Sequence, residues 1–275
     1  MRHEHKPKLA ISPSRNLGAK VAQGDYLIFL DSDVLLPEDY LLYVDTFLQK
    51  TNADCFGGPD KAHESFTDTQ KAISYAMTSF LTTGGIRGGN QHLHQFHPRG
   101  FNMGIRKPVF ESVNGYSQMT CGEDIELSIR IIKAGYVVKL NPDAFVYHKR
   151  RSTFKSFFRQ VFRFGAARVN IFQKHRRELK VIHFFPSLFV LLLIATFSGS
   201  FIFPLVGPVV LEILGVFTFV IVLQSTVLNK SIAVGLLSLI SSVLQLTGYG
   251  LGFIANAITV FVLRKKEGME LGASK

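Results

Sequence analysis

Two acidic side chains one residue apart, Asp31 and Asp33, follow directly on a short apolar run at residues 25–30. The run is rich in residues that favour strands and is bounded by a glycine and a proline, so it predicts a buried strand. Ligands of α/β proteins bind beyond the carboxyl ends of strands, and a hard divalent cation prefers oxygen ligands while it holds phosphates. The triplet Asp31-Ser32-Asp33 therefore indicates a metal–diphosphate site. The alternative is a pair of surface aspartates in a turn.

A second acidic pair, Glu123 and Asp124, opens the segment at 122–135, in which isoleucines recur at helical spacing. Acids in the first turn of a helix stabilise it through the helix dipole, and on the residues alone this explanation suffices. Three histidines, His92, His94 and His97, lie in a Gly-rich loop at 82–99. Their spacing matches no strong ligand motif, so solvated or substrate-facing histidines are favoured over a metal site.

Composition divides the chain into a polar and an apolar part. The segment from Phe184 to Leu263 carries only two formal charges, Glu212 and Lys230, which is typical of membrane segments. Its apolar runs at 184–203, 209–228 and 231–263 predict three membrane helices. Residues 1–8 are polar, so no signal peptide is expected. The two cysteines have no metal or redox spacing.

The net charge of +11 is concentrated just before the apolar part, where residues 149–180 hold eleven Lys or Arg and one Glu. The positive-inside rule and an anionic lipid surface explain this block better than nucleic acid does. Apolar residues at 152–172 follow helical spacing with basic residues between them, which predicts an amphipathic helix in the membrane interface. A helix packed on the rest of the protein is the alternative. With this block in the cytoplasm, three spans put Arg264-Lys265-Lys266 on the far side, against the same rule.

The remaining pattern alternates helices and strands and indicates an α/β domain. Helices are predicted at 14–22, 37–48, 67–81 and 108–114, and further strands at 53–58, 99–107, 136–140 and 144–148.

These segments, taken in order, resemble the family 2 glycosyltransferases of the inverting GT-A type, and the apolar part resembles the bacterial multi-pass members. The matching motifs are Arg15-Asn16-Leu-Gly-Ala, Asp25-Tyr-Leu-Ile-Phe-Leu-Asp31-Ser-Asp33, Gly100-Phe-Asn102-Met, Gly122-Glu123-Asp124, Val146-Tyr-His148 and Gln160-Val-Phe-Arg163-Phe164. Each motif alone is weak, and the ordered set is specific.

The resemblance implies a role for each of these residues. Asp31 and Asp33 would hold Mg²⁺ or Mn²⁺ on the diphosphate of a nucleotide sugar, with His148 assisting. Asp124, in a pair with Glu123, would be the base that deprotonates the acceptor hydroxyl. Donor or acceptor binding would fall to Arg15, Asn16, Ser32, Gly100, Asn102, Gln160, Arg163 and Phe164.

Two departures from the family pattern stand out. The family's Gln-X-X-Arg-Trp motif has Phe164 in place of Trp, which puts processive synthesis in doubt. Only 14 residues precede Arg15, whereas family members have further β-α-β units there. We therefore expect an N-terminally truncated domain whose parallel sheet lacks its first strands and part of the nucleotide pocket.

The predicted fold class is α/β: an incomplete, Rossmann-like GT-A domain at residues 1–150, a basic interfacial helix at 151–180 and a transmembrane region at 181–275. The predicted function is inverting, metal-assisted sugar transfer from a nucleotide sugar to a lipid-linked or polysaccharide acceptor. It is expected on the cytoplasmic side of the bacterial inner membrane. The alternatives are a subunit of a processive polysaccharide synthase and a catalytically impaired remnant that acts as a membrane scaffold.

Overall fold

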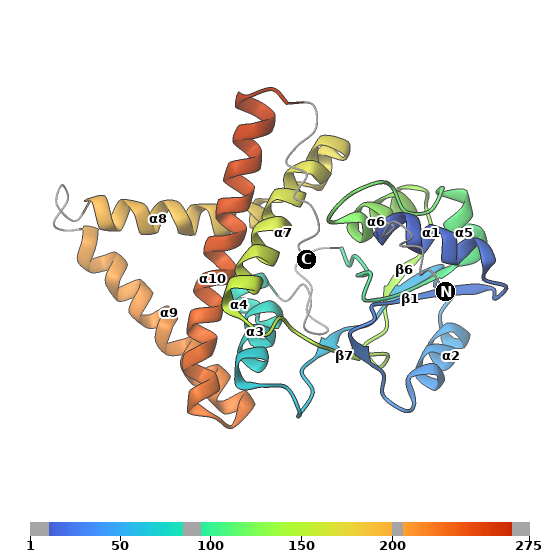
Figure 1. Cartoon of the computed structure of the whole chain (residues 1–275), viewed down its shortest axis with the longest axis horizontal. Coiled ribbons are helices and arrows are strands. Elements are labelled where there is room, and N and C mark those ends of the chain that lie inside the picture. The colour runs from blue at the N-terminus through green and yellow to red at the C-terminus, as the bar shows by residue number, and fades with distance from the viewer. Residues whose placement is uncertain (1–10, 85–94, 200–205, 266–275) are drawn as a thin grey trace, which may run out of the picture.

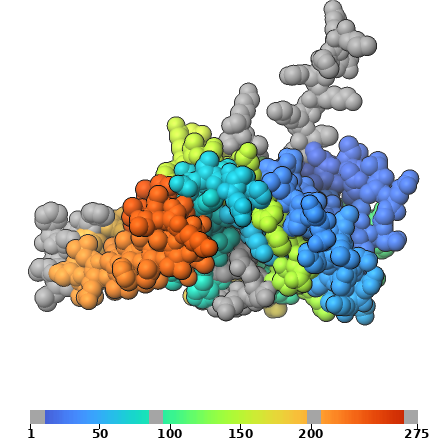
Figure 2. Space-filling model, turned by 90° about the horizontal axis from the view of Figure 1, so that it is seen from below, coloured from blue at the N-terminus to red at the C-terminus, as the bar shows by residue number. Residues whose placement is uncertain are grey.

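The computed structural model describes residues 11–84, 95–199 and 206–265. A sheet with flanking helices forms one side of the molecule and a group of long helices forms the other (Figure 1). In Figure 2 the cyan segment around α3 lies between the orange C-terminal helices and the blue N-terminal elements. The predicted α/β domain followed by a helical region is confirmed.

The central sheet has the strand order β1 (Tyr26–Leu30), β5 (Asn102–Arg106), β3 (Cys55–Gly57) and β6 (Val138–Leu140). It is mixed, and the expected parallel sheet was wrong: β5 runs antiparallel to both of its neighbours, and only β3 and β6 run parallel. Within the described residues β1 pairs with β5 alone, so β1 is an edge strand there.

A second sheet of very short strands has the order β2 (Val34–Leu35), β7 (Val146–His148) and β4 (Asp60–Lys61). Val34 lies opposite His148, and Asp60 lies opposite Val146. This sheet therefore brings together the end of the acidic triplet and a histidine more than a hundred residues away in sequence.

Helices cover both faces of the central sheet. One face packs against α1 (Ile11–Val21), α5 (Lys107–Ser112) and α6 (Glu123–Lys133) through a buried cluster that includes Ala19, Leu27, Ile105, Phe110 and Leu127. The other face packs against α2 (Tyr40–Lys50) through a cluster that includes Tyr40, Val44, Phe56, Phe101 and Val146. These two clusters fix β1 and α6, the elements that carry the acidic pairs.

Most predicted elements form, with shifted ends. The first helix begins at Ile11 rather than residue 14. The helix expected at 67–81 is split at Ser79 into α3 (Asp68–Thr78) and α4 (Phe80–Thr83), because the Ser79 side chain accepts a hydrogen bond from Leu81 N and caps a new helix.

The helix predicted at 152–172 is α7 (Phe154–Lys174), and its apolar side packs against α10 (Ile232–Ala257) and α3. A side chain added at Gly165 would collide with the backbone at Tyr249, and one added at Gly252 with the backbone at Phe162. Asn256 Nδ2 donates to Ala166 O and to Asn170 Oδ1, each at 2.7 Å. The apolar face of α7 therefore packs against the rest of the protein, which was the alternative to an interfacial helix. A position of α7 in the membrane interface stays a prediction.

Two helices are long and apolar enough to cross a bilayer, at 207–229 and 232–262, the second of which continues α10 into a π-helical turn, η3 (Ile258–Val262). The first of the three predicted spans corresponds to the 3-10 turn η2 (Val181–Phe184) and α8 (Phe185–Gly199). Its apolar stretch at 181–196 is shorter than the two candidate spans. A further 3-10 turn, η1 (Arg176–Glu178), precedes it, and α9 is Val206–Asn229. Membrane association is supported, and three crossings remain a prediction.

The glycine contact between α7 and α10 can be tested by adding one methyl group. We expect Gly252→Ala to destabilise the helical part by about 1–3 kcal/mol, because the new Cβ meets a backbone carbonyl that cannot yield. The matched control is Gly215→Ala on α9, where the added Cβ would meet no other helix within 4 Å among the described residues. Thermal unfolding in detergent measures both, and equal unfolding temperatures for the two variants would contradict the packing.

Candidate functional site

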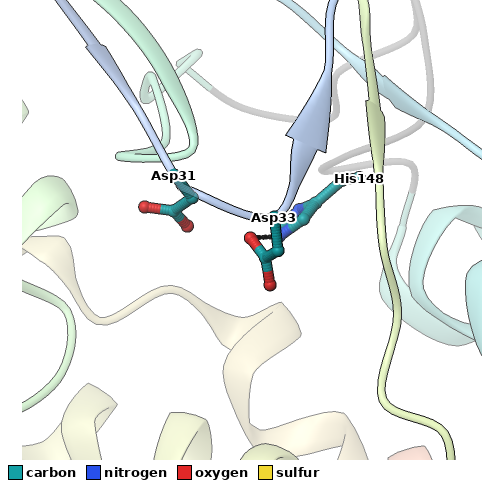
Figure 3. Close-up of side chains that lie close together, drawn as sticks. All are labelled: Asp31, Asp33 and His148. Carbon is teal, nitrogen blue, oxygen red and sulfur yellow. Dashed lines mark ion pairs between the residues drawn. The ribbon is translucent and has the colours of Figure 1, made fainter.

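Three side chains that could hold a cation converge where β1 ends. The candidate ligand atoms of Asp31, Asp33 and His148 all lie within 4.8 Å of one another. His148 Nε2 is 3.4 Å from Asp33 Oδ1, and Figure 3 shows this pair facing each other, with Asp31 nearby where β1 ends. Two carboxylates and an imidazole suit Mn²⁺ or Mg²⁺. The Asp33 side chain is 50% exposed, which leaves room for phosphate or water ligands.

Ion pairing within this group shifts both pKa values. The hydrogen bond with His148 lowers the pKa of Asp33. Burial opposes the charged form of His148, but its contacts with Asp33 and Asp60 outweigh burial, so the pKa of the imidazole is raised. With His148 protonated, the three groups carry two negative charges and one positive charge, so a net negative charge remains that a cation can balance.

Arg15 connects the acidic triplet to the second acidic pair. Its Nη2 donates to Asp31 Oδ1 at 2.8 Å and to Gly100 O at 3.2 Å, and its Nη1 donates to Glu123 Oε1 at 3.0 Å. The guanidinium carbon lies 5.2 Å from the ring centroid of Tyr116. A Cβ at position 100 would lie 2.5 Å from Arg15 Nη1, so a side chain there would displace this guanidinium.

The acidic pair at the start of α6 is divided between two environments. Burial, followed by the negative charge of Asp124, raises the pKa of Glu123 to about 7. Asp124 Oδ2 accepts a hydrogen bond from Gly100 N at 2.9 Å, and its Oδ1 accepts one from Ile125 N at 2.7 Å. Glu123 is thus held by Arg15, and backbone N–H groups orient Asp124.

A cavity of about 700 Å³ joins these groups to the helical part of the molecule. From the sheet side it is lined by the two acidic pairs and His148, and from the helical side by residues of α7, α8 and α10. Predicted site residues that line it are Arg15, Asp31, Asp33, Gly100, Glu123, Asp124, His148, Gln160, Arg163 and Phe164. Most of the motifs found in sequence therefore meet in one space.

Three predicted site residues do not line this cavity. Asn102 is fully buried, where it accepts a hydrogen bond from Tyr40 OH and donates one to Ala144 O. Asn16 bonds to both backbone groups of Tyr116, and Ser32 is exposed. The geometry gives Asn102 and Asn16 structural contacts, and ligand binding by these three stays a prediction that the geometry does not favour.

Of the three histidines, His92 and His94 lie outside the described residues. His97 is partly buried, and its Nδ1 is 2.6 Å from Ser128 Oγ on α6. Burial, with the nearby charges of Arg99 and Arg168, lowers its pKa to about 3. The solvated or substrate-facing role expected for His97 is replaced by packing against α6.

Two residues that were not predicted from the sequence lie on the Nδ1 side of His148: Asp60 contacts the imidazole, and Arg150 pairs with Asp60. Asp60 Oδ2 is 3.5 Å from His148 Nδ1 and 2.6 Å from Arg150 Nη2, and the exposed fractions of the Asp60 and Arg150 side chains are 0% and 3%. A carboxylate behind a ligating histidine fixes the ring and its tautomer. Asp60 directly follows a Gly-Gly-Pro turn, and Arg150 is one of many basic residues at 149–180. The sequence pattern therefore marked neither of them as a site residue.

Parts of the chain are similar to a known protein family and to two known proteins. The family model described as Glycosyl transferase family group 2 matches residues 26–228. The succinoglycan biosynthesis protein ExoA of Rhizobium meliloti is 30% identical over 156 residues, which are 56% of this chain and 47% of that protein. The probable glycosyltransferase YdaM of Bacillus subtilis is 33% identical over 61 residues, 22% of this chain and 14% of that protein. The matched region spans less than half of each relative.

Among solved structures, the mannosyltransferase PcManGT from Pyrobaculum calidifontis, in complex with GDP-Man and Mn²⁺, matches with a TM-score of 0.45 and 16% identity. The match covers 64% of this chain and 46% of that one.

The support that Asp60 gives His148 predicts a change in cation affinity. We expect Asp60→Asn to weaken Mn²⁺ binding by roughly 10- to 100-fold, because a ligating imidazole loses the carboxylate that orients it. Electron paramagnetic resonance of bound and free Mn²⁺ measures the affinity. Asp143→Asn, an exposed acid on the loop before β7, is the matched control. Unchanged affinity in a folded Asp60→Asn protein would rule out this support.

The raised pKa of Glu123 predicts a pH-dependent stability. Between pH 4.5 and about 7 the folded protein holds a proton on Glu123 that the unfolded chain has released. The free energy of unfolding therefore falls as pH rises through this window, and Glu123→Gln should remove that part of the slope. Chemical unfolding at several pH values measures it. An identical pH dependence in wild type and variant would show that Glu123 is not buried as described.

Proposed function

Because the chain belongs to glycosyl transferase family group 2 and is a glycosyltransferase, we propose that it transfers a sugar, with inversion, from a nucleotide-sugar donor to a lipid-linked or polysaccharide acceptor. The single observation that carries the proposal is the cavity that Asp31, Asp33, His148 and Asp124 line together. These groups supply the two requirements of the reaction, a site for the leaving diphosphate and a base for the attacking hydroxyl.

The diphosphate end of the reaction is assigned to the cation-binding group. Asp31, Asp33 and His148 would hold Mg²⁺ or Mn²⁺, which would neutralise the diphosphate as the sugar bond breaks. Asp60, which is itself paired with Arg150, would hold the His148 ring in place. Arg15 holds Asp31 at a fixed position through its 2.8 Å ion pair.

The acceptor end is assigned to Asp124. Its carboxylate is oriented by the N–H groups of Gly100 and Ile125, and it can take the proton of an acceptor hydroxyl that enters the cavity. A base on the acceptor side and a diphosphate leaving on the opposite side give inversion at the sugar carbon.

The setting of the reaction follows from the helical part. The helices at 207–229 and 232–262 and the adjacent basic block support a place at the inner membrane of a bacterium, with the cavity on the cytoplasmic side. The relative ExoA is named for succinoglycan biosynthesis, and we extend polysaccharide biosynthesis in the cell envelope to this chain as part of the proposal. The convergence of the acidic groups favours an enzyme over a scaffold.

The test is release of nucleoside diphosphate from nucleotide sugars by membranes that contain the full chain. We expect Asp33→Ala and Asp124→Asn each to lower the rate by at least roughly 100-fold, because the first removes a cation ligand and the second the base. Asp45→Asn, an exposed acid on α2, is the control and should match wild type.

Chelation of divalent cations should stop the reaction of wild type as well. Full activity in both cavity variants would overturn the site assignment, and a wild-type chain that releases no nucleoside diphosphate would overturn the activity.

A further inference from the structure

The long helix α10 lies beside α7 over most of its length, and both helices run in the same direction. Leu244 packs with Phe157 near the start of α7. Near its end, the ring of Phe172 is 5.9 Å from that of Phe261, between centroids. The close glycine contacts lie between these two points. The shared length is about 26 Å at 1.5 Å per residue, close to the thickness of a bilayer core. Hence α10 can cross a bilayer only if α7 crosses with it.

The charges of α7 exclude a crossing by this helix. Its basic residues are spread from one end to the other, at Lys155, Arg159, Arg163, Arg168 and Lys174. Three of these arginines line the cavity that also holds the carboxylates of both acidic pairs. Charged side chains are costly in the hydrocarbon core, and a crossing would place one of them at nearly every depth. Therefore α7, and with it α10, lies outside the path of a membrane crossing.

Both ends of α10 lie on the side of the α/β domain. Its first turns are next to the last turns of α9, where Tyr75 OH of α3 donates to Gln224 Oε1 at 2.6 Å. Met77, also on α3, belongs to the cluster that contains Leu244 of α10. At the other end, Val260 packs with Val169 of α7. A helix whose two ends both contact the same domain runs along that domain and not away from it.

The exposed side chains of α10 form one apolar stripe. They are between 39% and 70% exposed, and they are Ile232, Leu236, Ile240, Leu251 and Ile258. At 3.6 residues per turn these positions fall within an arc of about 100°. Gly252 and Asn256, which contact α7, lie on the opposite side. An apolar face of this kind along a whole helix suits the surface layer of a bilayer, where one side meets acyl chains and the other meets protein.

The helices that do leave the protein are α8 and α9. The first departs from the middle of α10, where a Cβ at Gly250 would collide with the backbone of Pro186. The second returns to the start of α10, where Ser225 Oγ is 2.7 Å from Ser238 Oγ. Figure 1 shows both helices extending from α10 on the side away from the sheet. With 15 residues after the four of η2, and with 24 residues, each is long enough for a core of about 30 Å.

We propose that α8 and α9 cross the bilayer as a pair, and that α10 lies with α7 along its cytoplasmic surface with the apolar stripe against the lipid. This inference rests on the proposed place at the membrane and replaces three crossings by two. Lys230 and Arg264, beside the two ends of α10, then lie on the same side as the basic block. The positive-inside rule, which three crossings violate, is thereby satisfied.

The sides of the membrane can be assigned by labelling single cysteines with a membrane-impermeant maleimide in inverted and right-side-out vesicles that contain the full chain. The background is Cys55→Ala and Cys121→Ala. The reporters are Pro208→Cys at the start of α9, Leu228→Cys at its end and Leu263→Cys after η3, all at exposed positions. We expect Leu228→Cys and Leu263→Cys to react from the cytoplasmic face, and Pro208→Cys to react from the opposite face.

Each other pattern of labelling contradicts the arrangement. Reaction of Leu228→Cys and Leu263→Cys from opposite faces would show that α10 crosses the bilayer. Reaction of Pro208→Cys from the cytoplasmic face would show that α8 does not cross. Neither measurement uses a sugar donor, so failure here is distinct from failure of sugar transfer in the activity test.

The depth of α10 is the second measurement, and it uses nitroxides on single cysteines of the full chain in lipid vesicles. Collision rates with oxygen and with a water-soluble nickel chelate give the depth of each nitroxide. The α10 positions are Ile232, Ile240, Leu251 and Ile258. The matched control positions on α9 are Val209, Val216 and Leu223. We expect the four depths on α10 to agree within about one helical turn, 5.4 Å, and Val216 to be the deepest on α9. A maximum of depth in the middle of α10 would overturn the proposal.

Discussion

The guanidinium of Arg15 is the interaction on which the arrangement of the site depends. Asp31 and Glu123 come from elements about ninety residues apart, and two carboxylates repel each other when no cation lies between them. Arg15 bonds to both and to Gly100 O, so it ties β1, the loop before β5 and α6 into one unit. Burial, followed by the nearby charge of Asp124, still raises the pKa of Glu123 to about 7. The ion pair with Arg15 therefore offsets only part of the cost of holding a carboxylate in this site.

The second constraint is the close contact of two helices. Since Gly165 and Gly252 leave no space for a side chain, the α7 and α10 backbones touch. One face of α7 is thereby committed to α10, and Gln160, Arg163 and Arg168 line the cavity from α7. Helices that associate in lipid use small residues for such contacts. The same contact thus holds α7 against the long apolar helix α10 and fixes one wall of the cavity.

Local patterns predicted much of this molecule. The strand before Asp31, the helix after Gly122 and the apolar helices follow from periodicity and composition, and ten of the thirteen site residues predicted from the ordered motifs line the cavity. The predictions that failed concern contacts between residues that lie far apart in the sequence. Asp60 reaches His148 only because β4 and β7 pair in the small sheet, which neighbouring residues do not encode. Asn102 lies at a motif position, yet its amide bonds to Tyr40 and Ala144 in the core.

In the proposed reaction, the placement of charge would let one cavity bind both the nucleotide-sugar donor and the acceptor. Acidic groups and His148 gather at the ends of β1 and β7, where a cation can recruit a diphosphate from water. Arg159, Arg163 and Arg168 of α7 line the same cavity from the helical side. Asp124 lies between these regions, held by backbone N–H groups that do not titrate. In the proposed reaction, the cation-binding group would hold the donor diphosphate, and Asp124 would face the hydroxyl of an acceptor that enters the cavity beside it.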